Sequence, residues 1–155
     1  MMVTLYNVIS KDGFIARKDG SEDFIPNDLW SKTLEVYKKY NTLVMGRKTY
    51  DVLQSYTPEL LEPFEQLSIR KIVVSEDESF QPKPGYEVVH SLEDAIHESN
   101  TLVSSGPTVN TYLLKKGLIK EVLLHVIPVN IDEGIPQFEI GNAELASKLP
   151  VHVLS

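Results

Sequence analysis

Apolar residues gather in short blocks along the chain, and longer segments of helical period separate the blocks. The blocks are VTLYNVI (3–9), TLVM (42–45), KIVVS (71–75), YEVVH (86–90), TLVSS (101–105) and EVLLHVI (121–127). They are rich in β-branched residues and almost free of charge, which is typical of strands buried on both faces of a sheet. VHVL (151–154) is expected to form a last short strand.

Four segments between these blocks have helical periodicity: 27–40, 47–53, the residues that follow Ser91, and 108–116. Asn27 is expected to cap the first of these helices. Ser91 is expected to cap the third, because Asp94 follows it three residues later.

Two segments are expected to lack regular structure. Residues 55–69 contain Pro58 and Pro63, and residues 128–147 are expected to be rich in loops.

The alternation of strands and helices predicts an α/β fold. We expect a three-layer sandwich with a central, mostly parallel mixed sheet covered on both sides. In such sheets ligands bind beyond the carboxyl ends of the strands, where helix amino termini point. Candidate chemistry is therefore sought at the strand-to-helix junctions.

Composition narrows the classes of protein. A length of 155 residues fits one domain, residues 1–155. The chain has no cysteine, which excludes a disulfide scaffold, thiolate metal sites and cysteine nucleophiles. The net charge of −7 disfavours a general nucleic-acid binder. No segment is long enough to span a membrane and the first residues do not resemble a signal peptide, so we expect a cytoplasmic protein.

The junction at Gly46 places two cations where a helix start disfavours them. Arg47 and Lys48 fall in the first turn, close to the positive end of the helix dipole. A phosphate there would meet free backbone N–H groups, both cations and the Thr49 hydroxyl, and glycine would let it approach closely. A solvated helix start with extended lysine and arginine side chains is an equally good interpretation of the motif by itself.

A second junction, SSGPTV (104–109), has the same character. Pro107 suits the first position of a helix that Gly117 is expected to end, and no acid occupies the first turn. Taken alone, an ordinary strand-to-helix turn is the better interpretation. Two such junctions in a short α/β chain suggest a ligand with several phosphates, such as a dinucleotide. The G-x-G-x-x-G and G-x-x-x-x-G-K-[ST] motifs are absent, which disfavours an ordinary Rossmann domain and a P-loop NTPase.

The order of motifs resembles the dihydrofolate reductase superfamily over roughly residues 2–140. The matching stretches are ISKDGFIARKDG, TLVMGRKTYDVL, RKIVVS and TLVSSGPTVNTYLLKKGLIKEVLLHVIP. The style is closest to the reductase domain of bifunctional riboflavin-biosynthesis proteins. The resemblance implies a central mixed sheet, NADPH as hydride donor, and a small heterocycle as acceptor.

The resemblance also implies cofactor-binding residues. The phosphates of NADPH are expected at Gly46, Arg47, Lys48 and Thr49, with Arg47 or Lys48 near the 2′-phosphate. The pyrophosphate and nicotinamide are expected beside Ser105, Gly106, Pro107 and Thr108. Ser75 would lie near the adenosine end, and the loop from Ile9 to Ala16 would cover the nicotinamide.

The chain departs from the family pattern at three places. Ser105 replaces a glycine that the family often has, which restricts the backbone there. Tyr6 lies near the position of a lysine in the riboflavin-pathway reductases, and this weakens the case for a phosphoribosyl-aminopyrimidine substrate. The family's last hairpin usually extends beyond Ser155, so a shortened or truncated domain is expected.

Two residues are the candidates for catalysis. Asp28 is the nearest match to the acid that holds the pterin ring in folate reductases, although an acid in a first turn is commonly a dipole partner. His125, the polar residue of an apolar strand, would lie near that acid and orient it or move a proton, although a buried structural histidine is the more common case.

Weaker candidates surround these two. Arg70 matches the position that binds a substrate carboxylate in folate reductases, and Trp30 and Tyr37 are candidates for an aromatic pocket or for core packing. The four histidines are scattered, and no metal is expected.

The sequence thus predicts an NADPH-dependent reductase that acts on a pteridine- or pyrimidine-like molecule. The alternatives are a true dihydrofolate reductase, a dinucleotide-binding module without catalysis, and a structural domain without a ligand. The expected partner is a small-molecule substrate, and a homodimer is plausible because the riboflavin-pathway relatives often pair.

Overall fold

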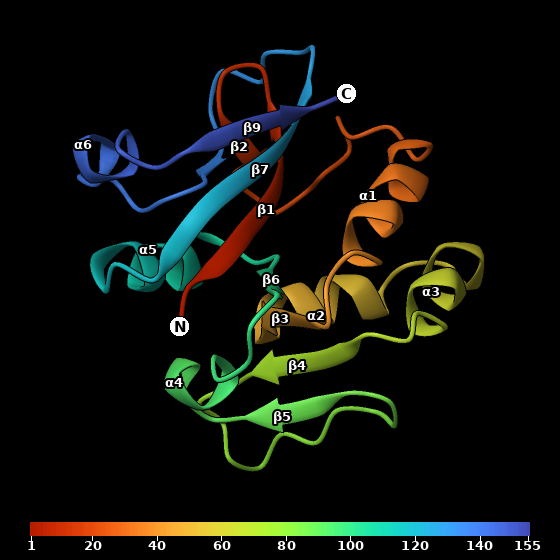
Figure 1. The fold of residues 1–155 in the computed structure, drawn as a ribbon. Coiled ribbons are helices and arrows are strands. Elements are labelled where there is room, and N and C mark those ends of the chain that lie inside the picture. Colours follow the sequence, from red (N-terminus) through yellow and green to blue (C-terminus); the bar gives the residue numbers. More distant parts are fainter.

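A computed structural model describes residues 1–155 and contains a seven-stranded sheet (Figure 1). In spatial order the strands are β5 (Glu87–Val89), β4 (Arg70–Val74), β3 (Thr42–Gly46), β6 (Thr101–Val103), β1 (Val3–Ser10), β7 (Ile119–Ile127) and β9 (Val151–Leu154). Every neighbouring pair in this sheet is parallel. The antiparallel pairing is confined to a separate pair, β2 (Phe14–Ala16) and β8 (Ile135–Pro136). The predicted three-layer α/β fold is confirmed.

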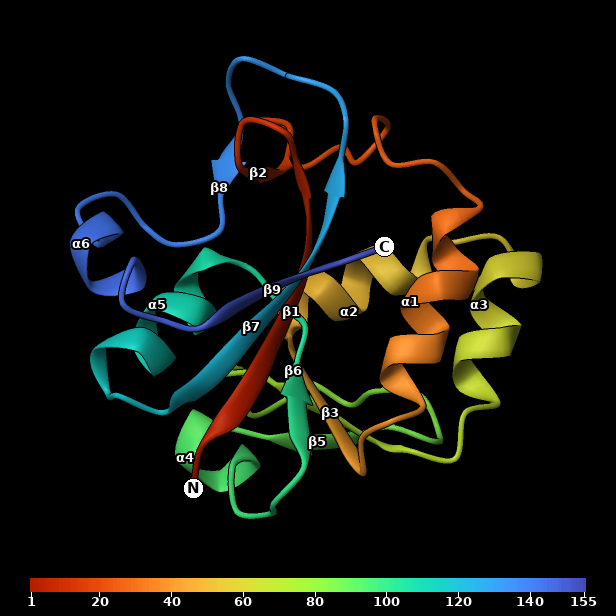
Figure 2. The ribbon, with the colours of Figure 1, turned by 45° about the horizontal axis from the view of Figure 1, so that its top comes forward.

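Helices cover both faces of the sheet (Figures 1 and 2). One face carries α1 (Leu29–Tyr37), α2 (Arg47–Gln54) and α3 (Pro58–Glu65). The other carries α4 (Leu92–Ala95) and α5 (Pro107–Lys115), with α6 (Ala143–Ala146) near α5. No helix combines the length and the apolar composition that crossing a bilayer requires.

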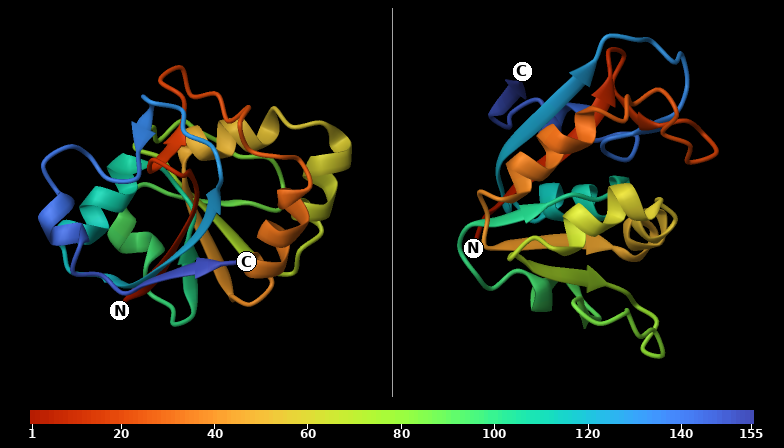
Figure 3. Two further views of the ribbon diagram at one scale, coloured as in Figure 1. Left: turned by 90° about the horizontal axis from the view of Figure 1, so that it is seen from above. Right: turned by 90° about the vertical axis from the view of Figure 1, so that its right-hand side faces the viewer.

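The core consists of two apolar clusters, one on each face of the sheet. Consecutive residues of β1 serve different clusters, because successive side chains of a strand point to opposite faces. Leu5 packs in the cluster beneath α5, and Tyr6 packs in the cluster beneath α1. Burial on both faces explains why polar and apolar residues do not alternate along the strands. The sheet also twists strongly from β5 to β9, as the views in Figure 3 show, which is the usual consequence of twisted strands.

The prediction that residues 55–69 are irregular was wrong, because α3 occupies most of that segment. Pro58 stands at the first helical position, where its missing N–H costs nothing. Pro63 lies inside the helix and removes one hydrogen bond. Leu61 and Phe64 are both buried by this helix, and Phe64 is fully inaccessible to solvent. Burial of these side chains therefore outweighs the local cost of Pro63.

The predicted caps had mixed outcomes. Ser91 caps α4 through its hydroxyl oxygen, which accepts a hydrogen bond from the Asp94 N–H. Gly117 follows α5 with φ of +68°, a conformation that glycine adopts readily. The prediction for Asn27 was wrong: Asp28 occupies the N-cap of α1, without a capping hydrogen bond, because its backbone is already helical.

Candidate functional site

The two phosphate-binding junctions predicted from the sequence lie side by side. Gly46 ends β3 and begins α2, whereas Gly106 follows β6 and begins α5. β3 and β6 are adjacent parallel strands, so both helix starts face the same edge of the sheet. Neither helix has a side-chain cap. The first N–H groups of a helix lack partners within it, so this edge offers two uncapped sets of donors.

A direct hydrogen bond joins the junctions, because the Gly46 N–H donates to Ser105 Oγ at 3.0 Å. Ser105 is buried, so its hydroxyl occupies space between the two loops. A Cβ atom at position 46 would lie 3.1 Å from Ser105 Oγ and 3.4 Å from a Val109 methyl group. Packing against the second junction therefore favours glycine at position 46. The Ser105 hydroxyl thus serves as the contact between the two loops.

The two cations of the first junction differ in their surroundings. The guanidinium of Arg47 stacks 3.8 Å from the centre of the Phe80 ring, and its Nε donates to Asp51 at 3.1 Å. Lys48 is exposed and takes part in no salt bridge. Arg47 is therefore held in place with part of its guanidinium exposed, whereas Lys48 can move. Thr49 is half-buried in the same turn.

Ser75 lies one strand further along the same edge. It follows β4, which pairs with β3, and it is buried. Its hydroxyl accepts a hydrogen bond from the Asp77 N–H at 3.2 Å, and its carbonyl accepts one from His90 at 2.8 Å. Hydrogen bonds to Ser79 lower the pKa of Asp77, and the charge of Arg47 contributes in the same direction.

Amides that the sequence analysis did not single out fix the position of Ser105. Asn7 Nδ2 donates to the Ser105 carbonyl at 2.9 Å, and Asn7 Oδ1 accepts from Gln137 at 3.0 Å and from Asn110 at 3.2 Å. Asn7 and Asn110 are buried. The sequence signal for this amide cluster was Asn7, a polar residue within the apolar block 3–9. A buried amide requires hydrogen-bond partners, so its position predicted other polar groups nearby.

The loop expected to cover the nicotinamide is tied to a second loop by Asp12. Its carboxylate accepts hydrogen bonds from the Ser10 hydroxyl at 2.7 Å and from the Asp132 N–H at 2.8 Å. These bonds lower the pKa of Asp12, with the Ser10 contact as the largest cause. The loop therefore has a defined position beyond the carboxyl end of β1.

His125 lies in a buried polar cluster on the α1 face of the sheet. Its Nδ1 is 2.6 Å from the Tyr6 hydroxyl, which is 2.8 Å from Thr33 Oγ1 on α1. All three residues are buried. Burial lowers the pKa of His125, and the charge of Lys32 adds to this effect. Burial also raises the pKa of Tyr6 to about 12, so the phenol stays protonated.

No hydrogen bond or salt bridge joins Asp28 to His125. Asp28 is exposed at the start of α1 and its carboxylate forms no hydrogen bond or salt bridge, whereas His125 bonds to Tyr6. A further acid, Glu22, had no signal in the sequence pattern; the residue is exposed, and its carboxylate accepts a hydrogen bond from Tyr56 at 3.3 Å. Removal of water by the neighbouring protein groups raises the pKa of Glu22. The catalytic roles of Asp28 and His125 remain predictions.

The aromatic residues of α1 belong mainly to the core. Trp30 packs edge-to-face on Tyr37 and Tyr56, and its indole N–H donates to the Leu60 carbonyl at 2.7 Å. Tyr37 is buried and its hydroxyl lies 3.1 Å from Ser104 Oγ.

Arg70 is engaged by carboxylates of the protein itself, and its role toward a substrate carboxylate stays a prediction. It begins β4, at the end of the strand opposite to the helix starts, and both oxygens of Glu87 bind its guanidinium at 2.6 and 2.8 Å. Glu98 also contacts this guanidinium. Arg70 is therefore part of an ion-pair cluster at the amino end of the sheet.

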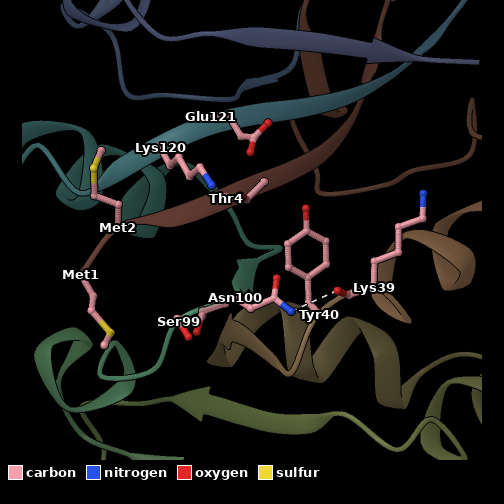
Figure 4. Close-up of a pocket in the computed structure, with 10 residues that line it drawn as sticks. Met1, Met2, Thr4, Lys39, Tyr40, Ser99, Asn100, Lys120 and Glu121 are labelled. Atoms are coloured by element: carbon pink, nitrogen blue, oxygen red, sulfur yellow. Dashed lines mark hydrogen bonds between the residues drawn. The ribbon is translucent and has the colours of Figure 1, made fainter.

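A cavity of about 440 Å³ also lies at the amino end of the strands (Figure 4). Its walls include Thr4, Lys39, Tyr40, Asn100, Lys120 and Glu121. Thr4 is near the start of β1, and Lys120 and Glu121 are near the start of β7. The cavity is thus separated from the two helix starts by the length of the sheet.

Comparison with solved structures identifies the fold. A candidate riboflavin biosynthesis protein from Shewanella sp. PV-4 is 25% identical, with a TM-score of 0.71 over 90% of this chain and 84% of that one. Dihydrofolate reductase from Enterococcus faecalis, solved with NADP(H) and RAB-propyl, is 21% identical, with a TM-score of 0.67 over 92% and 80%. The bifunctional deaminase and 5-amino-6-(5-phosphoribosylamino)uracil reductase of Thermotoga maritima is 20% identical, with a TM-score of 0.64 over 88% of this chain and 47% of that one.

Sequence relatives add no established activity. Two proteins of Bacillus subtilis strain 168, the uncharacterized YwjB and YyaP, are 27% and 24% identical over 143 residues. These matches cover 86% and 84% of this chain, and 80% and 76% of the relatives. No family model matches the chain. The protein has the dihydrofolate-reductase-like fold of its structural neighbours, which include reductases.

Proposed function

We propose that this protein is an NADPH-dependent reductase that transfers hydride to a C=N or C=O bond of a small pteridine- or pyrimidine-like heterocycle. The observation that carries the proposal is the pairing of two uncapped helix starts on adjacent strands, joined through Gly46 and Ser105. A ligand with two or more phosphates would meet backbone donors from both helices at once.

The order of the candidate residues along the sheet edge also supports a dinucleotide. Ser75 follows β4, Gly46 ends β3, Ser105 follows β6, and the loop held by Asp12 follows β1. These strands are neighbours in the order β4, β3, β6, β1. The resemblance to the superfamily assigns the same positions to adenosine, phosphates, pyrophosphate and nicotinamide, in that sequence. A linear cofactor lying across the strand ends would therefore meet each expected residue in turn.

The residues present suit the phosphates of NADPH. Arg47 and Lys48 add two cations to a protein with a net charge of −7, which concentrates attraction for an anion at this edge. NADPH would supply the hydride, and the protein would supply orientation and electrostatics. His125 lies on β7, the strand next to β1, and with Tyr6 and Thr33 it forms a cluster on the α1 face of the sheet that is the candidate to orient the acceptor molecule.

A non-catalytic dinucleotide-binding module is the second candidate, and one observation favours it. The acid expected to work with His125 is exposed at the start of α1 and forms no hydrogen bond or salt bridge with the histidine. In that case NADPH would bind and would remain unoxidised with every heterocycle offered.

The test is NADPH affinity, measured by fluorescence, for the wild type and for the double variant Arg47→Glu/Lys48→Glu. Loss of one charge-assisted phosphate contact costs about 1.5–3 kcal/mol, so we expect affinity to fall at least about tenfold. The matched control is Lys39→Glu/Lys120→Glu, which reverses two charges at the cavity on the opposite end of the sheet.

An equal loss of NADPH affinity in both double variants would show that net charge causes the effect. Arg47 and Lys48 would then not be phosphate-binding residues. Absence of NADPH binding by the wild type would refute the reductase proposal. With binding established, steady-state oxidation of NADPH across a panel of dihydrofolate, pyrimidine and pteridine compounds separates a reductase from a binding module.

A further inference from the structure

The buried cluster of Thr33, Tyr6 and His125 determines which ring nitrogen of the histidine carries the proton. We propose that Thr33 and Tyr6 are positioning residues that hold His125 neutral, with its proton on Nε2, so that Nε2–H is a fixed hydrogen-bond donor for an acceptor atom of the ligand. The acceptor would be a carbonyl oxygen or an unprotonated ring nitrogen.

The direction of the hydrogen bonds follows from the number of protons available. Thr33 Oγ1 has one hydrogen-bond partner, the Tyr6 hydroxyl at 2.8 Å, and the Thr33 side chain is buried, with 4% of the residue exposed. If Thr33 did not donate to Tyr6, its buried O–H would lack an acceptor, which is unfavourable. Thr33 therefore donates to the Tyr6 oxygen, and the single phenolic proton goes to His125 Nδ1, 2.6 Å away.

The accepting Nδ1 then has no proton of its own, so a neutral imidazole carries its proton on Nε2. This nitrogen has no hydrogen-bond partner in the protein. Among the fully buried side-chain nitrogen and oxygen atoms, Asn110 Oδ1 alone lacks a hydrogen-bond partner. His125 Nε2 also lacks a partner, so it cannot be fully buried and keeps some contact with solvent. Nε2–H is therefore a donor without a protein acceptor that the surroundings can still reach.

The charges that face His125 also favour an acceptor. The positive charge of Lys32 on α1 acts on His125 and helps to lower its pKa. On the adjacent strand β9, the residue opposite His125 is the apolar Leu154. His152, two residues earlier on β9, forms an ion pair with Glu121 at 3.3 Å. A protonated or amidine-like ligand edge would meet a donor and a cation and would be disfavoured. The choice of ligand rests on the proposed function, whereas the proton assignment does not.

Long-range ¹H–¹⁵N correlation spectra of the full chain labelled with [¹⁵N]histidine test the proposal near pH 8. His125 should show a protonated Nε2 and an unprotonated, hydrogen-bonded Nδ1. His90 and His97 are internal controls with the opposite pattern, because their Nδ1 atoms face the carbonyl oxygens of Ser75 and Asp94 at 2.8 and 3.0 Å. His125→Gln assigns the signals.

Two variants test the roles of the positioning residues. Tyr6→Phe should move the Nδ1 signal of His125 toward that of an imidazole without this bond. Thr33→Val should leave the proton on Nε2, because Tyr6 can still donate to Nδ1. A proton on Nδ1 in the wild type, an unchanged Nδ1 signal in Tyr6→Phe, or a switched proton in Thr33→Val would each overturn the assignment.

The ligand class is tested with two probes added to the same sample. We expect 5,6-diaminouracil, which presents carbonyl oxygens, to shift the Nε2–H signal of His125, and benzamidine, whose amidinium stays protonated near pH 8 and can only donate, to leave it unchanged. The reverse pattern, or no shift with either probe, would overturn the ligand class. Because these spectra need no cofactor, their failure is distinguishable from a failure of NADPH to bind.

Discussion

The two ends of the sheet differ in what they offer a ligand. The amino end has the cavity of about 440 Å³, and its nearby arginine, Arg70, is bound by Glu87 and Glu98. The carboxyl end has two uncapped helix starts, joined by the bond between Gly46 and Ser105, with Arg47 and Lys48 beside them. The amino end thus has volume lined by side chains but no helix starts, whereas the carboxyl end has the backbone N–H donors of two helix starts.

The proposed anion site does not coincide with the cavity, and the reason lies in the helix starts. In a parallel sheet every strand is followed by a helix that starts at the same edge, so the partial positive charges of helix starts accumulate there. The amino edge receives helix ends instead, which favour cations. A phosphate-bearing ligand is therefore expected at the carboxyl edge despite the cavity at the other one.

The largest expected effect comes from adding an acid to the second helix start. Thr108 is exposed in the first turn of α5, and Thr108→Glu should weaken NADPH binding by about tenfold, because a carboxylate would repel a phosphate there. The same charge should stabilise α5 by about 0.3–1 kcal/mol through the helix dipole. Fluorescence titration and thermal unfolding should thus move in opposite directions. Thr108→Gln is the neutral control, and equal affinity of the two variants would exclude this helix start from the site.

A smaller effect is expected from loosening the contact between the two junctions. Ser105→Ala removes the acceptor of the Gly46 N–H, and we expect the free energy of unfolding to fall by about 1 kcal/mol. NADPH affinity should fall by about threefold, because the two helix starts lose their fixed spacing. Ser104→Ala is the matched control, since it removes a hydroxyl contact with Tyr37 from the same loop. An equal loss of affinity in the control would contradict the role of Ser105.

The smallest effect is expected at the amino end. Arg70→Met should lower the free energy of unfolding by at most about 1 kcal/mol, because the ion pairs are partly exposed, and should leave NADPH affinity unchanged. The hydrogen bonds from Arg70 lower the pKa of Glu87 in the folded protein below its value in the unfolded chain. The ion pair therefore stabilises the fold fully above the usual glutamate pKa, and this stabilisation is lost as the pH falls through the lowered pKa. The difference between wild type and variant should shrink on acidification in denaturant titrations. A change in NADPH affinity would show that the two ends are coupled.

Local pattern predicted most of the elements, and its failures have a physical cause. The block 42–45 became β3 because its residues are buried on both faces. Residues 58–65 were misjudged because Pro63 disfavours a helix locally, whereas the burial of Phe64 stabilises one and depends on distant residues. Asn27 was misjudged because the chain turns into helical geometry at Asp28.

The site was predictable where it consists of one continuous segment. Gly46 to Thr49 and Ser105 to Thr108 were identified as helix starts, and the structure places both at helix starts. The partners of His125 were not identified, because Tyr6 lies 119 residues away in sequence and Thr33 on another element. The pairing of Asp28 with His125 was expected from resemblance alone, and no hydrogen bond or salt bridge joins them.

The sequence by itself determined the strands, most of the helices and the two glycine-containing helix starts, because these depend on period, propensity and neighbouring residues. The tertiary structure alone decided that the two starts touch, that Arg70 lies at the far end, and that Thr33, Tyr6 and His125 form one chain of hydrogen bonds. These contacts join residues that are far apart in the chain. They form when the sheet orders its strands, and no local pattern encodes that order.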